Sequence, residues 1–227
     1  MEITHHIISA LENKYFDIDL EEFRTIISET LSRLAEVSHP DEIRESGIPT
    51  TDFRSDVVNH TRCFFLIEHY FRYAPPEDRF IEKIYAVVYG IQVHDITLRS
   101  VEHIEDFGGD SLDSVSTVEA NLGILNRQLR EVSAQAMESV ERKTTFLSRI
   151  FSGIIKAHPF HDGNGRAARM VVQYCLRYWG YPYMIIPKVR NDRVWKKALG
   201  NGLQGDFSGM QCFFQQNMLG DQTKELR

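Results

Sequence analysis

The sequence predicts a mainly α-helical fold with one short β-hairpin. Apolar residues recur at three- and four-residue steps through most of the 227 residues, which is the spacing of helices that bury one face. Residues 96–115 depart from that spacing, and they include the turn signal Gly108-Gly109-Asp110. No internal repeat or low-complexity segment is present, so we expect one large helical domain, with or without a smaller appended segment.

Three helices are expected in the first part of the chain. Over residues 19–37 the apolar positions form a single stripe, made of Leu20, Phe23, Ile27, Leu31 and Leu34. Residues 53–73 contain a larger share of apolar residues than residues 19–37, which predicts a helix at the centre of the fold. Pro75-Pro76-Glu77-Asp78 marks a helix that should run to about His94, because proline is tolerated and carboxylates are favoured in a first turn.

The short β element and the remaining helices are expected after residue 95. Residues 98–104 alternate roughly between apolar and polar before the glycine turn, which predicts a short hairpin near residues 98–115. Ser116-Thr117-Val118-Glu119 has the pattern of a capping box at a helix start. Further helices are expected over about residues 142–157, 164–179, 190–202 and 207–218.

Composition and charge exclude several function classes. The formal net charge of −6 argues against a broad nucleic-acid surface, which needs clustered lysine and arginine. No apolar run approaches the roughly 20 residues of a membrane span, and residues 1–6 lack the basic start of a signal peptide. We therefore expect a cytoplasmic protein, or one delivered into a host cell, that binds neither nucleic acid nor membrane. Cys63, Cys175 and Cys212 lie far apart in apolar pattern and are expected to be buried thiols.

A polar break between two core helices is the strongest functional signal. Residues 158–169 read HPFHDGNGRAAR, between the apolar stripes of the helices before and after. The first helix should end at His158, because a residue that precedes proline is displaced from the α region. The second should start near Gly165, and its first N–H groups could approach an anion because Gly163 and Gly165 carry no side chain. The break is therefore expected to form a phosphate cradle.

The side chains around this cradle fit phosphate chemistry. Arg166 and Arg169 are three residues apart in the first turn, so both could hold phosphate oxygens. Asp162 is a hard oxygen ligand of the kind that Mg²⁺ takes alongside substrate phosphates. His158, neutral near pH 7, could accept the proton of an attacking hydroxyl. The alternatives are a purely structural histidine and a metal site of His158, His161 and Asp162, which the arginines would disfavour by repelling a cation.

The run from His158 to Arg169 resembles the complete HxFx(D/E)GNGRxxR signature of Fic-domain proteins. Most Fic proteins are adenylyltransferases, which move AMP from ATP to a Ser, Thr or Tyr hydroxyl of a target protein. The resemblance implies a Fic-type helical bundle, with His158 as general base and Asp162 as Mg²⁺ ligand. The residues that it places at the phosphates are Gly163, Asn164, Gly165, Arg166 and Arg169.

The resemblance extends beyond the motif. The expected hairpin lies where Fic proteins have a flap, which pairs with an extended segment of the target protein and aims its hydroxyl. Residues 180–182 and 192–206 resemble the region that borders the nucleotide base, although Leu203 stands where some relatives have asparagine. Gly165 separates the chain from the kinase-like branch, which has lysine there. Nucleotide preference is left open, and Trp195 is either a base-stacking residue or a helix anchor.

Some Fic proteins are restrained by a helix with the pattern (S/T)xxxE(G/N). Residues 25–29, Thr-Ile-Ile-Ser-Glu, match in part and are followed by Thr30 rather than glycine or asparagine. By resemblance, Glu29 would pair with Arg169 and block the γ-phosphate; a solvated helix face is the alternative. The chain would then divide into an N-terminal helical segment with a regulatory role, residues 1–50, and a Fic domain, residues 51–220.

The function expected from the sequence is protein adenylylation, with ATP as co-substrate and Mg²⁺ as cofactor. Two alternatives stay open. One is a Fic enzyme that uses another nucleotide donor or removes AMP from a modified protein. The other is a non-catalytic partner in a toxin–antitoxin or effector complex. The expected partners are a target protein docked on the flap and either an antitoxin or the chain's own inhibitory helix; a homo-oligomer is also compatible with the sequence.

Overall fold

The computed structural model describes residues 59, 62–68, 71–73, 75–101, 112–134, 139–184, 186 and 193–220. The segment 1–50, with the helix expected over 19–37 and Glu29, lies outside the described residues, as do residues 102–111 of the expected hairpin. Within the described residues the fold is mainly helical, as predicted. None of the helices described is of a length and hydropathy that would let it span a bilayer.

The order of the elements agrees closely with the sequence pattern in the second half of the chain. The α-helices are α5 (Phe80–Tyr89), α6 (Val118–Ala134), α7 (Val140–Ala157), α8 (Asn164–Tyr178), α9 (Arg193–Leu203) and α10 (Ser208–Gly220). The 3-10 turns are η1 (Phe71–Tyr73), η2 (Val93–Asp95) and η3 (Val115–Thr117). Residues 62–68 are also helical. Because Ser116 lies inside η3, the helical run starts after Ser114, and the capping box expected at Ser116 is wrong.

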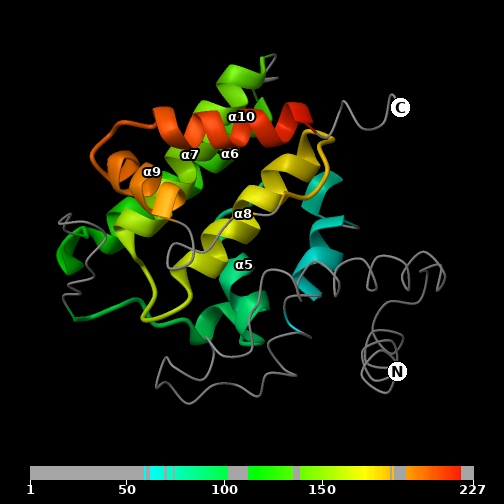
Figure 1. The fold of residues 1–227 in the computed structure, drawn as a ribbon. Coiled ribbons are helices and arrows are strands. Elements are labelled where there is room, and N and C mark those ends of the chain that lie inside the picture. The colour runs from blue at the N-terminus through cyan, green and yellow to red at the C-terminus, as the bar shows by residue number, and fades with distance from the viewer. Residues whose placement is uncertain are drawn as a thin grey trace, which may run out of the picture.

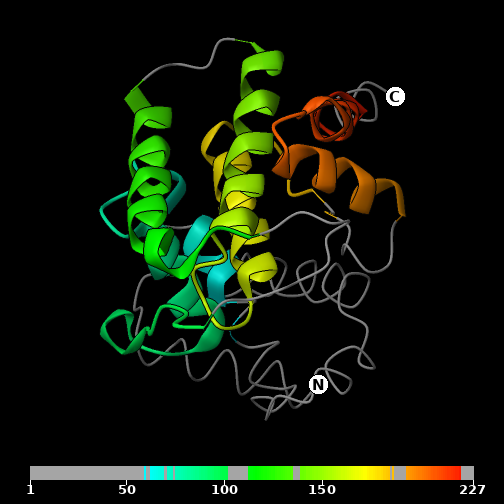
Figure 2. The same cartoon turned by 90° about the vertical axis from the view of Figure 1, so that its left-hand side faces the viewer.

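The helix α7 lies at the centre of the described fold. It packs against α6, α8, α9 and α10, while α5 packs against α8 (Figure 1). In the perpendicular view α6 and α7 stand side by side, and the loop from α7 to α8 lies at one end of them (Figure 2). Residues 62–68 contribute the buried side chains of Cys63, Phe65 and Ile67. The α7–α8 loop is therefore carried by two well-packed helices.

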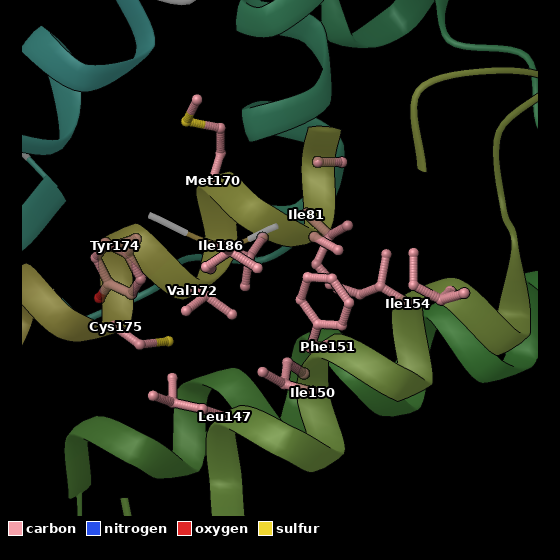
Figure 3. Close-up of a cluster of buried hydrophobic side chains, with 14 of the residues drawn as sticks. Ile81, Leu147, Ile150, Phe151, Ile154, Met170, Val172, Tyr174, Cys175 and Ile186 are labelled. Atoms are coloured by element: carbon pink, nitrogen blue, oxygen red, sulfur yellow. The ribbon is translucent and has the colours of Figure 1, made fainter. Parts of the chain in front are cut away.

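Apolar side chains from α7 and α8 form the middle of the core. Leu147, Ile150 and Phe151 of α7 face Val172 and Cys175 of α8 (Figure 3). These side chains recur at three- and four-residue steps and are almost fully buried. Burial of a side chain of this size stabilises a fold by about 1.5–3 kcal/mol. The two helices on either side of the polar break are thus held rigidly.

The helix expected over residues 75–94 is shorter than predicted. It begins at Phe80 and ends at Tyr89, where Gly90 takes a left-handed conformation with φ 65°. Its start is set by α6, because Asn126 accepts a hydrogen bond from Ile81 N at 3.0 Å. The prediction continued the helix through residues 91–94 because Ile91 and Val93 prolong the apolar pattern, whereas Gly90 is a typical C-terminal signal.

The expected hairpin is described only at its base. Leu98 forms an isolated antiparallel bridge with Phe160, and Arg99 N donates to Pro159 O at 2.9 Å. Asp113 N donates to Lys156 O at 2.9 Å. Both arms of this segment are therefore attached to the end of α7 and to the loop after it, whereas the hairpin itself stays a prediction.

Two of the expectations for single side chains are settled by burial. Cys63 and Cys175 are buried free thiols, as predicted, and burial raises the pKa of Cys63 to about 12. The same prediction is wrong for Cys212, which is exposed on α10.

Trp195 is 2% exposed and packs against Phe151 and Phe214, so it is a helix anchor rather than a base-stacking surface.

An ion pair joins residues 62–68 to the far end of α8. Arg177 donates to both oxygens of Glu68, Nε to Oε2 at 2.8 Å and Nη2 to Oε1 at 2.7 Å, and Tyr183 Oη donates to Oε2 at 3.0 Å. Burial raises the pKa of Glu68, but the hydrogen bonds from Arg177 and Tyr183 outweigh it, so the pKa lies below its ordinary value. The carboxylate is thus stabilised in its charged form.

Replacing Glu68 with glutamine is expected to reduce the free energy of unfolding at pH 7 by about 1–3 kcal/mol. Because the pKa of Glu68 is lower in the folded chain than in the unfolded chain, its contribution is complete above the ordinary value of 4.5. It is lost as pH falls through the folded-state pKa. Urea unfolding at pH 7 and about pH 3 measures this: the gap between variant and wild type should shrink in acid. An undiminished gap would contradict an electrostatic origin.

Candidate active site

His158 lies at the point where α7 ends. Its N–H donates to Ile154 O at 3.0 Å, and its backbone is left-handed, with φ 43° and ψ 56°. The expected helix end is therefore confirmed, in a conformation that is uncommon for residues other than glycine. The residue is 6% exposed, and Nδ1 lies 3.4 Å from Ile155 O. Backbone strain and burial together fix where the imidazole stands.

Arg99 holds the backbone at this helix end. Its Nε donates to His158 O at 2.8 Å, and its Nη2 donates to Ala157 O at 3.4 Å and to Asp113 O. The residue is 2% exposed. Carbonyls without intrahelical partners and the negative end of the helix dipole favour a cation here. The guanidinium thus joins the C-terminus of α7 to both arms of the segment that the sequence predicts to be the flap.

Replacing Arg99 with methionine is expected to lower the free energy of unfolding by about 1–3 kcal/mol, because buried carbonyls would lose their donors. Methionine keeps much of the side-chain volume, so the effect isolates the lost hydrogen bonds. Lysine at this position keeps the charge but cannot donate in a planar fork, and should recover only part of the loss. Urea unfolding of the two variants measures both effects. Full recovery by lysine would show that charge alone matters.

The Asn164 side chain binds the backbone of the loop between α7 and α8. Its Oδ1 accepts from Phe160 N at 2.9 Å, and its Nδ2 donates to Phe160 O at 2.8 Å. Both residues are buried, and Phe160 is a core residue. The side chain that the resemblance places at the phosphates is therefore engaged with the loop backbone. A contact between Asn164 and an anion would come from its backbone N–H at the first turn of α8.

Asp162 and Arg166 are brought together by the start of α8. Arg166 Nη2 donates to Asp162 Oδ2 at 2.7 Å, and the Asp162 side chain is 46% exposed. Tyr89, from the last turn of α5, donates its hydroxyl to the same Oδ2 at 2.8 Å. Arg166 also donates to the Tyr89 hydroxyl, and its guanidinium carbon lies 4.4 Å from the centre of the Tyr89 ring. The expected metal ligand and one expected phosphate contact thus form one cluster with a tyrosine.

An aromatic stack connects this cluster to the core. The rings of Phe160 and Tyr85 lie 3.7 Å apart at 14°, and those of Tyr85 and Tyr89 lie 4.5 Å apart at 27°. Burial raises the pKa of Tyr89 well above its ordinary value, so its hydroxyl stays protonated and can donate to Asp162. Gly163, with φ 78°, lies against the Tyr89 ring, and an added Cβ would overlap it. Gly163 is therefore required by its conformation and by this packing.

Among the residues that the structure describes, no contact explains Gly165 in this way. An added Cβ would meet one described atom, Arg169 Nη1, at an ordinary contact distance of 3.5 Å. Its backbone is helical, where alanine would be favoured by about 0.5–1 kcal/mol. The first N–H groups of α8 lie at this turn beside the Arg169 guanidinium, an arrangement that suits close approach of an anion.

The stretch of sequence that matches a known protein family includes the loop between α7 and α8. Residues 91–176 match the model of the Fic/DOC family. The matched stretch includes Arg99 and the whole loop from His158 to Arg169, and it covers less than half of the chain. No curated protein matched the sequence.

Solved Fic structures share the fold. A Fic domain containing signaling protein from Bacteroides thetaiotaomicron is similar with a TM-score of 0.63 and 15% identity, over 97% of this chain and 95% of that chain. A glutamate-to-glycine variant of Fic-1 from C. elegans is similar with a TM-score of 0.60 and 16% identity, over 99% of this chain and 71% of that chain. At these identities the similarity establishes a Fic-type helical fold.

The departure from the Fic pattern at Leu203 is explained by packing. Leu203 is 4% exposed and belongs to the core cluster, so its side chain packs in the protein interior. The carbonyl of Leu203 accepts from Lys156 Nζ at 3.1 Å, which joins α9 to the last turn of α7. Asp206, in the Gly-Asp pair that follows, accepts from Ser208 N at 3.0 Å and starts α10.

The metal site of two histidines and an aspartate is not supported. Across the described ranges, no three His, Cys, Asp or Glu side chains are grouped so as to hold a metal ion. His161 is exposed, whereas His158 is buried. A Mg²⁺ ion held by one carboxylate and substrate phosphates needs no such group.

Sequence reasoning missed Tyr89 and Arg99, which contact the loop between α7 and α8. Tyr89 falls within the helix expected to run to about His94, and Arg99 falls within the roughly alternating residues 98–104, but the pattern marks neither as functional. Tyr85 and Tyr89 are four residues apart, the spacing of one helix face, but only the position of α5 against α8 shows what that face meets.

Proposed function

We propose that this protein is a Mg²⁺-dependent protein adenylyltransferase that moves AMP from ATP to a Ser, Thr or Tyr hydroxyl of a target protein. The observation that carries the proposal is the juxtaposition, within one loop, of a buried histidine at the end of α7 and the N-terminus of α8. The loop lies within the stretch that matches the Fic/DOC family. A base and an anion-binding site meeting at one point suit attack of a hydroxyl on a phosphate.

His158 would serve as the general base. When its Nδ1 carries the proton, that N–H donates to Ile155 O, 3.4 Å away, and Nε2 presents the lone pair. Nε2 would take the proton of the target hydroxyl as its oxygen bonds to the α-phosphorus. The bond from that phosphorus to the oxygen of the β-phosphate would break in line, and pyrophosphate would leave. Proton transfer to a positioned base of this kind contributes about 10²- to 10⁴-fold in rate.

The start of α8 would hold the nucleotide phosphates. Backbone N–H groups from Asn164 to Arg166 have no intrahelical partners and carry the positive end of the helix dipole. Arg169 lies beside Gly165, and Arg166 would exchange Asp162 for a phosphate oxygen. Asp162 and the phosphates would hold Mg²⁺, which supplies neutralisation of charge on the leaving pyrophosphate. The exposure of Asp162 and the lack of a side chain at Gly165 support this fit.

Intact-mass analysis tests the proposal. The protein and candidate targets are incubated with Mg²⁺ and each nucleoside triphosphate in turn, for wild type beside His158→Ala. The expected result is a mass increase of one adenylyl group, which is AMP less one water, dependent on ATP and on His158. An adduct from a different triphosphate would show that the enzyme uses another nucleotide donor. Loss of AMP from a modified target would show that it removes AMP. No change with any donor, including in a Glu29→Gly variant, would favour the non-catalytic alternative.

The Glu29→Gly variant tests self-inhibition separately. If Glu29 occupies Arg169 in the resting protein, its removal should increase adduct formation, because carboxylate and γ-phosphate compete for one guanidinium. Equal activity of the variant and wild type would discard the inhibitory role of Glu29 and leave the transferase proposal intact.

A further inference from the structure

Tyr89 contacts the expected metal ligand at one oxygen only. Its hydroxyl donates to Asp162 Oδ2, the same atom that pairs with Arg166. In the part of the chain that the structure describes, Asp162 Oδ1 has neither a hydrogen bond nor an ion pair. The carboxylate is therefore oriented by donors on one side and open on the other.

The ring of Tyr89 is held by several contacts. Tyr85 stacks on it with ring centres 4.5 Å apart, and Tyr85 in turn stacks on the fully buried Phe160. Gly163 and the Arg166 guanidinium cover other parts of the ring. The hydroxyl position is thus set by the core rather than by a mobile side chain.

The two donors to Asp162 Oδ2 differ in what nucleotide binding would do to them. Under the proposed function Arg166 turns to a phosphate oxygen and leaves the carboxylate. The Tyr89 hydroxyl, held by its ring, would remain. A carboxylate that ligates a metal through one oxygen is oriented by a hydrogen bond to the other, and such partners contribute about 10- to 100-fold in metal affinity.

We propose that Tyr89 is a positioning residue for the divalent cation: its hydroxyl holds Asp162 Oδ2 so that Oδ1 faces the metal and the nucleotide phosphates. This inference rests on the proposed function, because it takes Asp162 as the metal ligand. It assigns a role to a residue that lies outside the signature loop and outside the stretch that matches the family. It also gives a functional reason for Gly163, whose missing side chain lets the Tyr89 ring reach Asp162.

Direct binding of Mn²⁺, measured by electron paramagnetic resonance, tests the inference without turnover. The full chain is titrated with Mn²⁺ in the presence of α,β-methylene-ATP, whose α–β linkage cannot be cleaved. Tyr89→Phe keeps the ring, the stack and the contact of the Arg166 guanidinium with the ring. It removes the hydroxyl, with the hydrogen bond that the hydroxyl donates to Asp162 and the one that it accepts from Arg166. Its Mn²⁺ affinity is expected to fall by about 10- to 100-fold. Its affinity for α,β-methylene-ATP in EDTA and its thermal midpoint should stay close to those of wild type.

Tyr85→Phe is the matched control. It removes a hydroxyl from the same stack, and that hydroxyl has no hydrogen bond in the described part of the chain. Its Mn²⁺ affinity should match that of wild type. Unchanged Mn²⁺ affinity in Tyr89→Phe, or an equal loss in Tyr85→Phe, would overturn the positioning role.

Asp162→Asn separates failure of this inference from failure of the proposed function. If Asp162→Asn loses Mn²⁺ binding and Tyr89→Phe does not, only the role of Tyr89 fails. If Asp162→Asn binds Mn²⁺ like wild type, Asp162 is not the metal ligand, and the inference fails together with that part of the proposed function.

Discussion

Replacing His158 with asparagine is expected to reduce the rate of adduct formation by about 10²- to 10⁴-fold, the range that a general base contributes. Asparagine is chosen because it tolerates the left-handed conformation that His158 adopts, with φ 43°. The substitution therefore removes the base and keeps the backbone cap of α7. Rates are measured by intact mass under saturating ATP and Mg²⁺, against a target that the wild type modifies.

A matched alanine variant shows whether the backbone contributes. Alanine is strained at positive φ, so His158→Ala should be less stable than His158→Asn while losing a similar amount of activity. Full activity in His158→Asn would contradict the assignment of His158 as base. Loss of activity that follows the loss of stability across both variants would point to a structural role instead.

Replacing Gly165 with alanine is expected to separate activity from stability. Alanine at this helical position has room, since the added Cβ meets Arg169 Nη1 at 3.5 Å, and it should raise the free energy of unfolding by up to about 0.5–1 kcal/mol. The same methyl group would stand between the backbone N–H groups and a phosphate. Loss of one such donor to a transition state lowers the rate by about 10²- to 10³-fold. Urea unfolding and the mass assay measure the two quantities.

Gly163→Ala is the control for this pair of effects. Positive φ and overlap with the Tyr89 ring should lower its free energy of unfolding by about 1–3 kcal/mol, in addition to any loss of activity. Two glycines, two residues apart, are thus expected to differ in the sign of their effect on stability. Wild-type activity in Gly165→Ala would remove the reason for placing a phosphate at this helix start.

Several parts of the fold could be predicted because they depend on local pattern. The helices α7, α8, α9 and α10 follow from apolar spacing, and the end of α7 at His158 follows from the proline after it. Where the spacing was weak, the prediction was wrong or incomplete. The helix α5 ends at Tyr89, before Gly90, rather than near His94, and Cys212 is exposed although its surroundings are apolar.

The sequence by itself determined the helical class of this protein and the identity of the loop between α7 and α8, because helix period, proline and glycine act over a few neighbouring residues. Only the tertiary structure decided which distant side chains meet that loop. Tyr89 comes from α5, and Arg99 from the segment before α6, each more than fifty residues away in the chain. Such contacts depend on how whole helices pack, and packing is set by the shapes of many side chains at once.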